Sequence, residues 1–265
     1  MDDDHGVTAR VLWEASSPPG GWGRPWPQCA ELARALPTDQ WTLVGGLMVQ
    51  LHSAVAGLTV SRPTTDVDIV LHMETGAATM PRVASVLRSL GYVLMQSING
   101  DSPAHRFLRG NEQLDVMVAD HLVPRLVPRI GGRKVFQVTG GTQALRRTVN
   151  CRIVVNHGDA VSISIPNRLG ALVLKGAAYQ EDSRDKGRHL DDAATLLATI
   201  TGPLELAADM GGSDRSRILG LNRALADPSH ESWKVLDHGD RARAISNLAV
   251  LCANPDRLPV RRLGR

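Results

Sequence analysis

The stretch RPTTDVDIVL, residues 62–71, decides how the chain is interpreted. Its alternation of polar and apolar residues predicts a half-buried strand, on which Asp66 and Asp68 share one face with side-chain bases roughly 6–7 Å apart. The apolar side chains on the other face are Val67, Ile69 and Leu71. Two neighbouring carboxylates cost free energy unless a cation or a buried partner offsets them. The pair alone is not specific, because 27 acids in 265 residues predict roughly three such pairs by chance.

A glycine pair upstream gives the first context for these aspartates. Gly45-Gly46 lies between WTLV at 41–44, which predicts a strand, and LMVQLHSAV at 47–55, which predicts a helix. Glycines at such a turn let a ligand approach the backbone, and the free N–H groups of a helix start attract phosphate. A tight strand-to-helix turn is the alternative interpretation of the pair.

A third aspartate follows in LDVMV, residues 114–118. Asp115 shares a strand face with Met117, while the other three side chains take the opposite face. If this strand lies beside the first, three carboxylates converge at one edge of a sheet. Such oxygen ligands suit Mg²⁺, with Mn²⁺ as the alternative ion. A site of this kind can activate an attacking hydroxyl and neutralise a leaving pyrophosphate.

The order of glycine turn, helix, R-x-T-x-D-x-D strand and later lone acid resembles the nucleotidyltransferase superfamily of polymerase-beta type. The segment IPNRLGALVLKGAAYQEDSRDKGRHLDDAATLL, residues 165–197, looks like the second signature of the AbiEii/MenT toxin nucleotidyltransferases. That pattern places a lysine on one helix and an aspartate on the next. Lys175 matches the lysine and Asp192 the aspartate, with Asp191 as the competing choice because RHLDD departs from the usual pattern. The resemblance covers roughly residues 41–200.

The resemblance implies a fold and a reaction. The expected fold is α+β, a nucleotidyltransferase-type mixed β-sheet with packed helices, followed by a C-terminal helical bundle. The expected reaction is Mg²⁺-dependent transfer of NMP from an NTP to an RNA hydroxyl, with the tRNA 3′ end as the acceptor. The protein would then be the toxin of a toxin–antitoxin or abortive-infection system. Its partners would be an NTP, RNA and a cognate antitoxin.

The same resemblance implies roles for the matched residues. Asp66, Asp68 and Asp115 would bind the metal ions, and Asp115 would also help to draw the proton from the acceptor hydroxyl. Gly45-Gly46 would hold phosphate. Lys175 would steady the triphosphate as a compact positive charge.

Other positions near the signature carry open alternatives. Asp192 would either orient the lysine or position the acceptor hydroxyl. Arg62 and Thr64 would brace the loop before the first aspartate, and Arg62 is equally suited to a phosphate contact. A basic set forms either a rim that faces RNA or a solvated loop: Arg184, Lys186 and Arg188. Three histidines outside any metal-binding pattern are most simply packing or surface residues: His52, His72 and His189.

Two rival functions remain open. The same fold could modify a small molecule, such as an aminoglycoside, or a protein hydroxyl. A degenerate nucleotidyltransferase domain could instead act as a non-enzymatic binding module. Intact acids at all three positions count against the second rival.

The composition narrows the class of protein. The chain is 43% hydrophobic and 22% charged, a composition typical of a globular protein, which argues against a disordered one. It has no run of about 18 apolar residues and begins with the acidic MDDDHG, so we expect a soluble cytoplasmic protein without a membrane partner. Three widely spaced cysteines predict free thiols.

The charge and the aromatic residues bear on the partner. Residues 121–190 contain twelve lysines and arginines against four acids, which suits a polyanion, although solvated arginines are an equal alternative. Aromatic residues make up only 3% of the chain, and the sequence shows no base-stacking platform. This argues against a dedicated single-strand RNA-binding module.

We expect three parts along the chain: an N-terminal arm and short helix at 1–40, a nucleotidyltransferase core at 41–165 and a C-terminal helical domain at 166–265. Helices besides the one after the glycine pair are predicted at 28–36, 80–90, 141–147, 167–179, 190–198, 203–210, 215–226 and 240–252. Extended segments are predicted at 92–98, 105–109 and 113–119, and a second set of strands at 134–138, 151–155 and 161–165.

Overall fold

The strand that carries the aspartate pair lies inside a mixed β-sheet. The computed structural model describes residues 10–18, 20–59, 63–95, 103–155 and 158–254. Within these ranges the main sheet has the strand order β2-β3-β6-β5-β4, and β9 pairs with β6. The strands are β2 (Trp41–Val44), β3 (Asp66–Leu71), β4 (Val93–Leu94), β5 (Arg106–Arg109), β6 (Glu112–Ala119) and β9 (Gln137–Val138). The β3–β6 and β6–β9 pairs are parallel and the other pairs are antiparallel.

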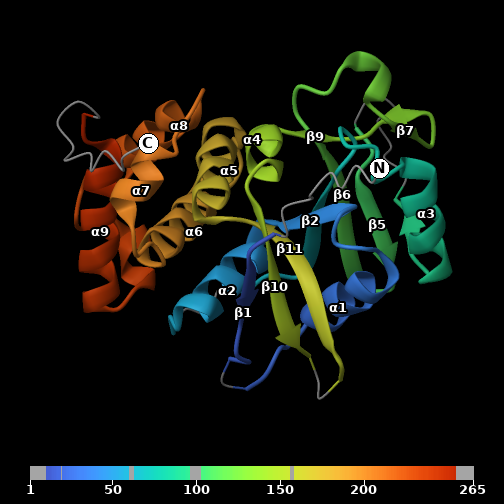
Figure 1. The fold of residues 1–265 in the computed structure, drawn as a ribbon, viewed down its shortest axis with the longest axis horizontal. Helices are drawn as coiled ribbons and strands as arrows, with labels where there is room; N and C mark the ends of the chain where they lie inside the picture. The colour runs from blue at the N-terminus through green and yellow to red at the C-terminus, as the bar shows by residue number, and fades with distance from the viewer. Residues whose placement is uncertain (1–9, 19, 60–62, 96–102, 156–157, 255–265) are drawn as a thin grey trace, which may run out of the picture.

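A second sheet lies beside the first. Its order is β1-β10-β11, formed by β1 (Leu12–Glu14), β10 (Thr148–Val154) and β11 (Ala160–Pro166). The β11 strand lies next to β2, and the Thr42 and Ser164 hydroxyl oxygens are 2.9 Å apart. A small hairpin of β7 (Arg129–Ile130) and β8 (Arg133–Lys134) lies near α3 (Met80–Ser89) at one end of the molecule (Figure 1).

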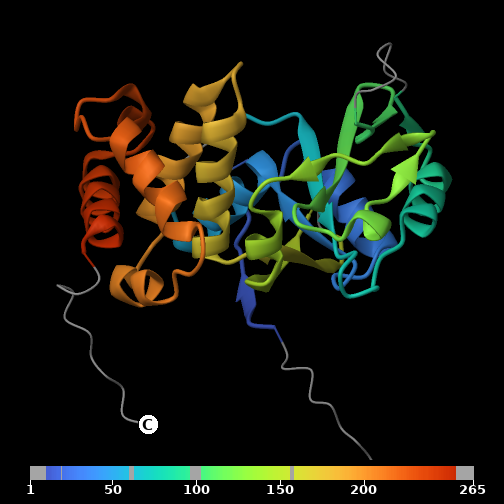
Figure 2. The same ribbon diagram turned by 90° about the horizontal axis from the view of Figure 1, so that it is seen from above.

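The second half of the described chain is helical. After α1 (Trp26–Ala35), α2 (Gly45–Ala56) and the short α4 (Gly141–Leu145), the remaining helices follow one another: α5 (Arg168–Glu181), α6 (Lys186–Ala198), α7 (Pro203–Ala208), α8 (Asp214–Ala224) and α9 (His238–Cys252). Single 3₁₀ turns lie at Pro124–Leu126 and Glu231–Val235. Figures 1 and 2 agree that α5 and α6 stand between the sheets and the outer helices α7–α9.

Local chemistry explains where the central helices begin. The side chain of Asn167 accepts a hydrogen bond from the Gly170 N–H at the start of α5, and Asp185 accepts one from the Arg188 N–H at the start of α6. Both residues are preferred helix N-caps. The α2 helix ends at Gly57, whose φ of +69° is left-handed, a conformation that glycine adopts without a Cβ penalty.

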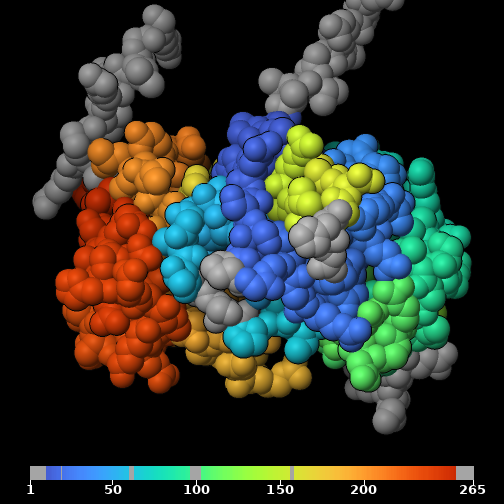
Figure 3. Space-filling model, turned by 90° about the horizontal axis from the view of Figure 1, so that it is seen from below, coloured from blue at the N-terminus to red at the C-terminus, as the bar shows by residue number. Residues whose placement is uncertain are grey.

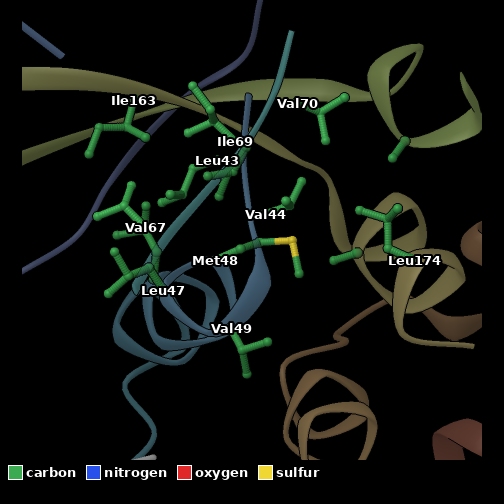
Figure 4. Close-up of a cluster of buried hydrophobic side chains, with 14 of the residues drawn as sticks. Leu43, Val44, Leu47, Met48, Val49, Val67, Ile69, Val70, Ile163 and Leu174 are labelled. Atoms are coloured by element: carbon green, nitrogen blue, oxygen red, sulfur yellow. The ribbon is translucent and has the colours of Figure 1, made fainter. Parts of the chain in front are cut away.

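One hydrophobic cluster joins the sheets to the helices. It runs from Ala15 to Leu251, across the boundary expected near residue 166. Figure 4 shows its centre, where Met48 on α2 is directed toward Leu174 on α5. Figure 3 shows the N-terminal segment lying across the middle of one face, between α2 and β10–β11. The division into three parts stays a prediction.

The α+β architecture with mixed sheets is confirmed, and several element bounds differ from expectation. β1 was not predicted. The predicted 134–138 strand is wrong as one element: Phe136 passes between β8 and β9, its N–H donating to the Ala104 carbonyl and its carbonyl accepting from the Val118 N–H. β9 therefore belongs to the main sheet. The segment predicted at 92–98 is a strand only over Val93–Leu94, and positions 96–98 fall outside the described residues.

Within the described ranges, none of the helices combines the length and the apolar character needed to cross a bilayer.

Candidate functional site

The three predicted carboxylates meet on one face of the main sheet. Parallel pairing of β3 and β6 places Asp68 directly beside Asp115, and Asp66 beside Gln113. Each of the three aspartates offers a carboxylate oxygen, and these oxygens all lie within 4.8 Å of one another. The predicted convergence is therefore confirmed, and it depends on the register of this one pair of strands.

Two of these carboxylates are held by neutral and cationic donors. The Asp66 carboxylate accepts from the Thr64 hydroxyl at 2.9 Å and from the Gln113 amide at 3.3 Å. The Arg106 guanidinium on β5 donates to both Asp115 oxygens, at 3.0 and 2.9 Å, in the bidentate geometry that makes such pairs strong. The same amide of Gln113 also reaches Asp115, at 3.3 Å. These contacts fix both side chains without using all of their lone pairs.

Asp68 differs from its neighbours. Within the described part of the chain, no side-chain or backbone group donates a hydrogen bond to it. Burial, followed by the charges of Asp66 and Asp115, raises its pKa from 3.8 to about 7, and Lys175 opposes that rise only in part. The charges of Lys175 and Arg188 therefore compensate an ionised Asp68 only in part.

Gly45 is required by the position of this carboxylate. A Cβ atom at Gly45 would lie 1.9 Å from an Asp68 carboxylate oxygen, and its φ of +71° is left-handed. Any side chain here would both collide and strain the backbone. The glycine pair thus forms a tight strand-to-helix turn, with Gly45 beneath the carboxylate and Gly46 in the first turn of α2.

The donor set fits a hard divalent cation. Three carboxylate oxygens from two neighbouring strands are the ligands that Mg²⁺ or Mn²⁺ prefers. A bound cation would also offset the repulsion among Asp66, Asp68 and Asp115.

Lys175 and Asp192 face this sheet from the helices. The Lys175 Nζ lies 2.7 Å from an Asp192 carboxylate oxygen, and both side chains are buried. The pair joins α5 to α6 at the cavity wall. Asp191 is half-buried on α6 and is not part of the lining, so the structure places Asp192 rather than Asp191 at the site. The ion pair is compatible with the predicted orienting role of Asp192.

The turn between α5 and α6 adds charged groups to the rim. Asp182 accepts from the backbone N–H of Arg184 and from His189, which together lower its pKa to about 2. Burial, and then the charge of Lys175, lower the pKa of His189, and its hydrogen bond to Asp182 opposes this in part. Arg184 and Arg188 line the cavity, while Lys186 is not among the lining residues and lies over the Tyr179 ring.

A single cavity of about 730 Å³ joins these groups. Its acidic side is the carboxylate cluster, and its cationic side contains Lys175, Arg184 and Arg188. An apolar strip of Met117, Phe136 and Val138 borders the acidic side. This volume lies within the range of about 300–1,000 Å³ typical of small-molecule sites.

The cavity brings together most of the residues that the sequence singled out. The predicted residues that line it are Gly45, Gly46, Thr64, Asp66, Asp68, Asp115, Lys175 and Asp192. Arg62 lies outside the described residues.

Sequence reasoning missed several groups at this site. The sequence does not single out Arg106, Gln113, Phe136 or Asp182. It predicts His189 only as a packing or surface residue, whereas His189 lines the cavity and contacts Asp182. Arg106 could have been found, because the two residues Gly110-Asn111 join β5 and β6, and a two-residue hairpin loop fixes its register. That register places Arg106 opposite Asp115.

Comparisons of the chain with protein-family models, with curated proteins and with solved structures give no match. The chemistry of the cavity therefore rests on its own geometry.

Proposed function

We propose that this chain is a Mg²⁺-dependent nucleotidyltransferase that transfers NMP from an NTP to an RNA hydroxyl. The observation that supports this most is the pairing of opposite chemistries in one cavity. Carboxylate oxygens of Asp66, Asp68 and Asp115 cluster within 4.8 Å on the sheet, and Lys175 faces them from α5. A magnesium-bound triphosphate needs both kinds of group, carboxylates for the metal and cations for the outer phosphates.

The reaction can be written from these groups. An acceptor oxygen forms a bond to the α-phosphorus of the NTP, the bond from that phosphorus to the bridging oxygen breaks, and pyrophosphate leaves with the electron pair. The proton of the attacking hydroxyl passes to a carboxylate of the cluster and then to water. Asp115 is proposed as the base that takes this proton. Bound Mg²⁺ would supply Lewis-acid stabilisation of the phosphate charge. Lys175, held by Asp192, would steady the triphosphate, and the Gly45-Gly46 backbone would lie beside a phosphate.

The acceptor and the biological role extend this proposal. We propose tRNA 3′ ends as the acceptor and a toxin role within a toxin–antitoxin or abortive-infection system, in a cytoplasmic setting. The support is the resemblance in the two signatures and the arginines on the cavity rim. Arg184 and Arg188 would meet the phosphate backbone, and a cognate antitoxin would be expected to block this rim.

The direct test is label transfer. The full chain is incubated with Mg²⁺, each NTP labelled in its α-phosphate, and tRNA, a short RNA or an aminoglycoside. We expect labelled tRNA from the wild type, no label from Asp68→Asn, and wild-type transfer from the matched control Asp191→Asn. Folded wild-type protein that labels no acceptor, including itself, would refute the proposal. Label on the aminoglycoside alone would replace RNA as the acceptor.

The toxin role is tested in cells. Induced wild-type protein should arrest growth, whereas Asp66→Ala at equal abundance should not. Equal growth of the two strains would exclude the toxin role and leave the enzymatic proposal standing.

A further inference from the structure

Phe136 is an exposed aromatic ring at the edge of the cavity. Its side chain is 39% exposed and lines the cavity, whereas Phe107, the other phenylalanine of the chain, is only 2% exposed. The Phe136 backbone is held on both sides, by the carbonyl of Ala104 and by the N–H of Val118. The exposed ring is therefore presented by a fixed segment of backbone.

The ring continues the face that carries the carboxylates. Parallel pairing of β6 with β9 places Val118 beside Gln137, so Phe136 comes beside Met117, two residues beyond Asp115. Residues two apart on a strand share a face. Met117 and Val138 line the same cavity, so the apolar strip begins where the acidic cluster ends.

A second ring supports Phe136. The His105 ring packs against it with ring centroids 5.5 Å apart and an interplanar angle of 53°. Aromatic pairs at this separation restrict each other's orientation. A supported, partly exposed ring beside a polar site offers one face for stacking, because every nucleobase has a π-face of matching size.

We propose that Phe136, with Met117 beside it, binds the heterocyclic base of a nucleotide by stacking. This inference rests on the proposed function and adds a base-binding part to the same cavity. The carboxylates and Lys175 would hold the phosphates, and the apolar strip would hold the base. Stacking does not distinguish bases by hydrogen bonding, so this contact gives only a modest preference among the four bases. The base belongs either to the NTP or to the last nucleotide of the acceptor, and both present the same chemistry.

The test separates the base from the phosphates. With Mg²⁺ present, binding of inorganic tripolyphosphate, ATP and a short single-stranded RNA to the full chain is measured by calorimetry. The variants are Phe136→Ala, Phe136→Trp and the control Val93→Ala, an exposed apolar residue on β4 that is 69% exposed and does not line the cavity. Loss of a base stack weakens binding roughly 5- to 150-fold.

If the ring binds the NTP base, Phe136→Ala weakens ATP binding by that factor, Phe136→Trp retains it and tripolyphosphate binding does not change. If the ring binds the acceptor base, Phe136→Ala weakens RNA binding and leaves ATP unchanged. Quenching of a 2-aminopurine nucleotide by the wild type, lost in Phe136→Ala, reports the stack directly.

Two other outcomes overturn the inference. If Phe136→Ala binds both ATP and RNA as tightly as the wild type does, stacking is excluded while the proposed nucleotidyl transfer is unaffected. A wild type that binds neither ATP nor RNA would exclude stacking and the proposed function together. Stacking without any label transfer would exclude only the reaction.

Discussion

Asp68→Asn should make the free energy of unfolding depend less on pH and on magnesium. Burial and the charges of Asp66 and Asp115 raise the pKa of Asp68 from 3.8 to about 7. Between these values the folded chain keeps a proton that the unfolded chain has released, so the free energy of unfolding falls as the pH rises. The difference corresponds to at most about 4 kcal/mol, at about 1.4 kcal/mol for each pH unit. Asparagine carries no charge and avoids this loss.

The assay is urea denaturation with chelator at about pH 4 and about pH 8, followed by the same series with Mg²⁺. Wild type should lose up to about 4 kcal/mol more than Asp68→Asn between these pH values, and Mg²⁺ should restore much of that loss by binding only the folded state. Asp191→Asn, an acid on α6 outside the cavity lining, should follow the wild type. Parallel pH curves for wild type and Asp68→Asn would refute this reasoning, as would equal stabilisation of both by Mg²⁺.

Three further substitutions test other parts of the site. Gly45→Ala would place a Cβ atom 1.9 Å from the Asp68 carboxylate oxygen and should abolish the Mg²⁺-induced rise in melting temperature. The control Gly57→Ala also has a left-handed φ, +69°, but open space around it. It should lower the free energy of unfolding by about 1 kcal/mol and keep the Mg²⁺-induced rise. Retained metal response in Gly45→Ala would contradict this. Lys175→Met removes the ammonium group that lies 2.7 Å from the buried Asp192 carboxylate, and should destabilise the folded protein by about 3–5 kcal/mol in urea denaturation. Adding Asp192→Leu should restore stability but not label transfer, and an active double variant would exclude the proposed role of the pair. Arg106→Gln should lower the half-saturating Mg²⁺ concentration severalfold and reduce turnover, because one competing positive charge and one orienting contact are lost. A higher half-saturating concentration would mean that Arg106 mainly orients its partner.

The carboxylate cluster could be predicted from the sequence because its signal is local. The two-residue period of a strand places Asp66 and Asp68 on one face whatever the rest of the fold does. The register that brings Asp115 beside Asp68 could not be predicted, since a long crossover between parallel strands leaves register open. From the sequence, the three aspartates were expected to converge only if the two strands lay side by side. In contrast, the two-residue β5–β6 loop does fix the register of these strands, so the pairing of Arg106 with Asp115 could have been predicted from the sequence.

Strands of two or three residues are too short to show a periodic pattern, so the sequence does not predict them. β1 spans only Leu12–Glu14, and it is held by pairing with β10, a segment more than a hundred residues away. The segment KVFQV at 134–138 has the pattern of one strand. In the structure Lys134 pairs with β7 and Gln137 with β6, and Phe136 between them is hydrogen-bonded to Ala104 and Val118. A composition with few aromatic residues gave no reason to expect a ring at the cavity.

The relative position of the two cavity walls depends on strands rather than on the charged turn between α5 and α6. β2 leads directly into α2 beneath the carboxylates, and β11 leads through one capping residue into the helix of Lys175. Thr42 and Ser164 join these two strands through their hydroxyl groups, and the His52 ring on α2 lies 3.0 Å from the carbonyl oxygen of Pro166 at the end of β11. Because these contacts are buried, they place Lys175 opposite the acidic cluster independently of residues 182–185. The arginines of this turn can therefore vary while Lys175 and the three aspartates keep their spacing.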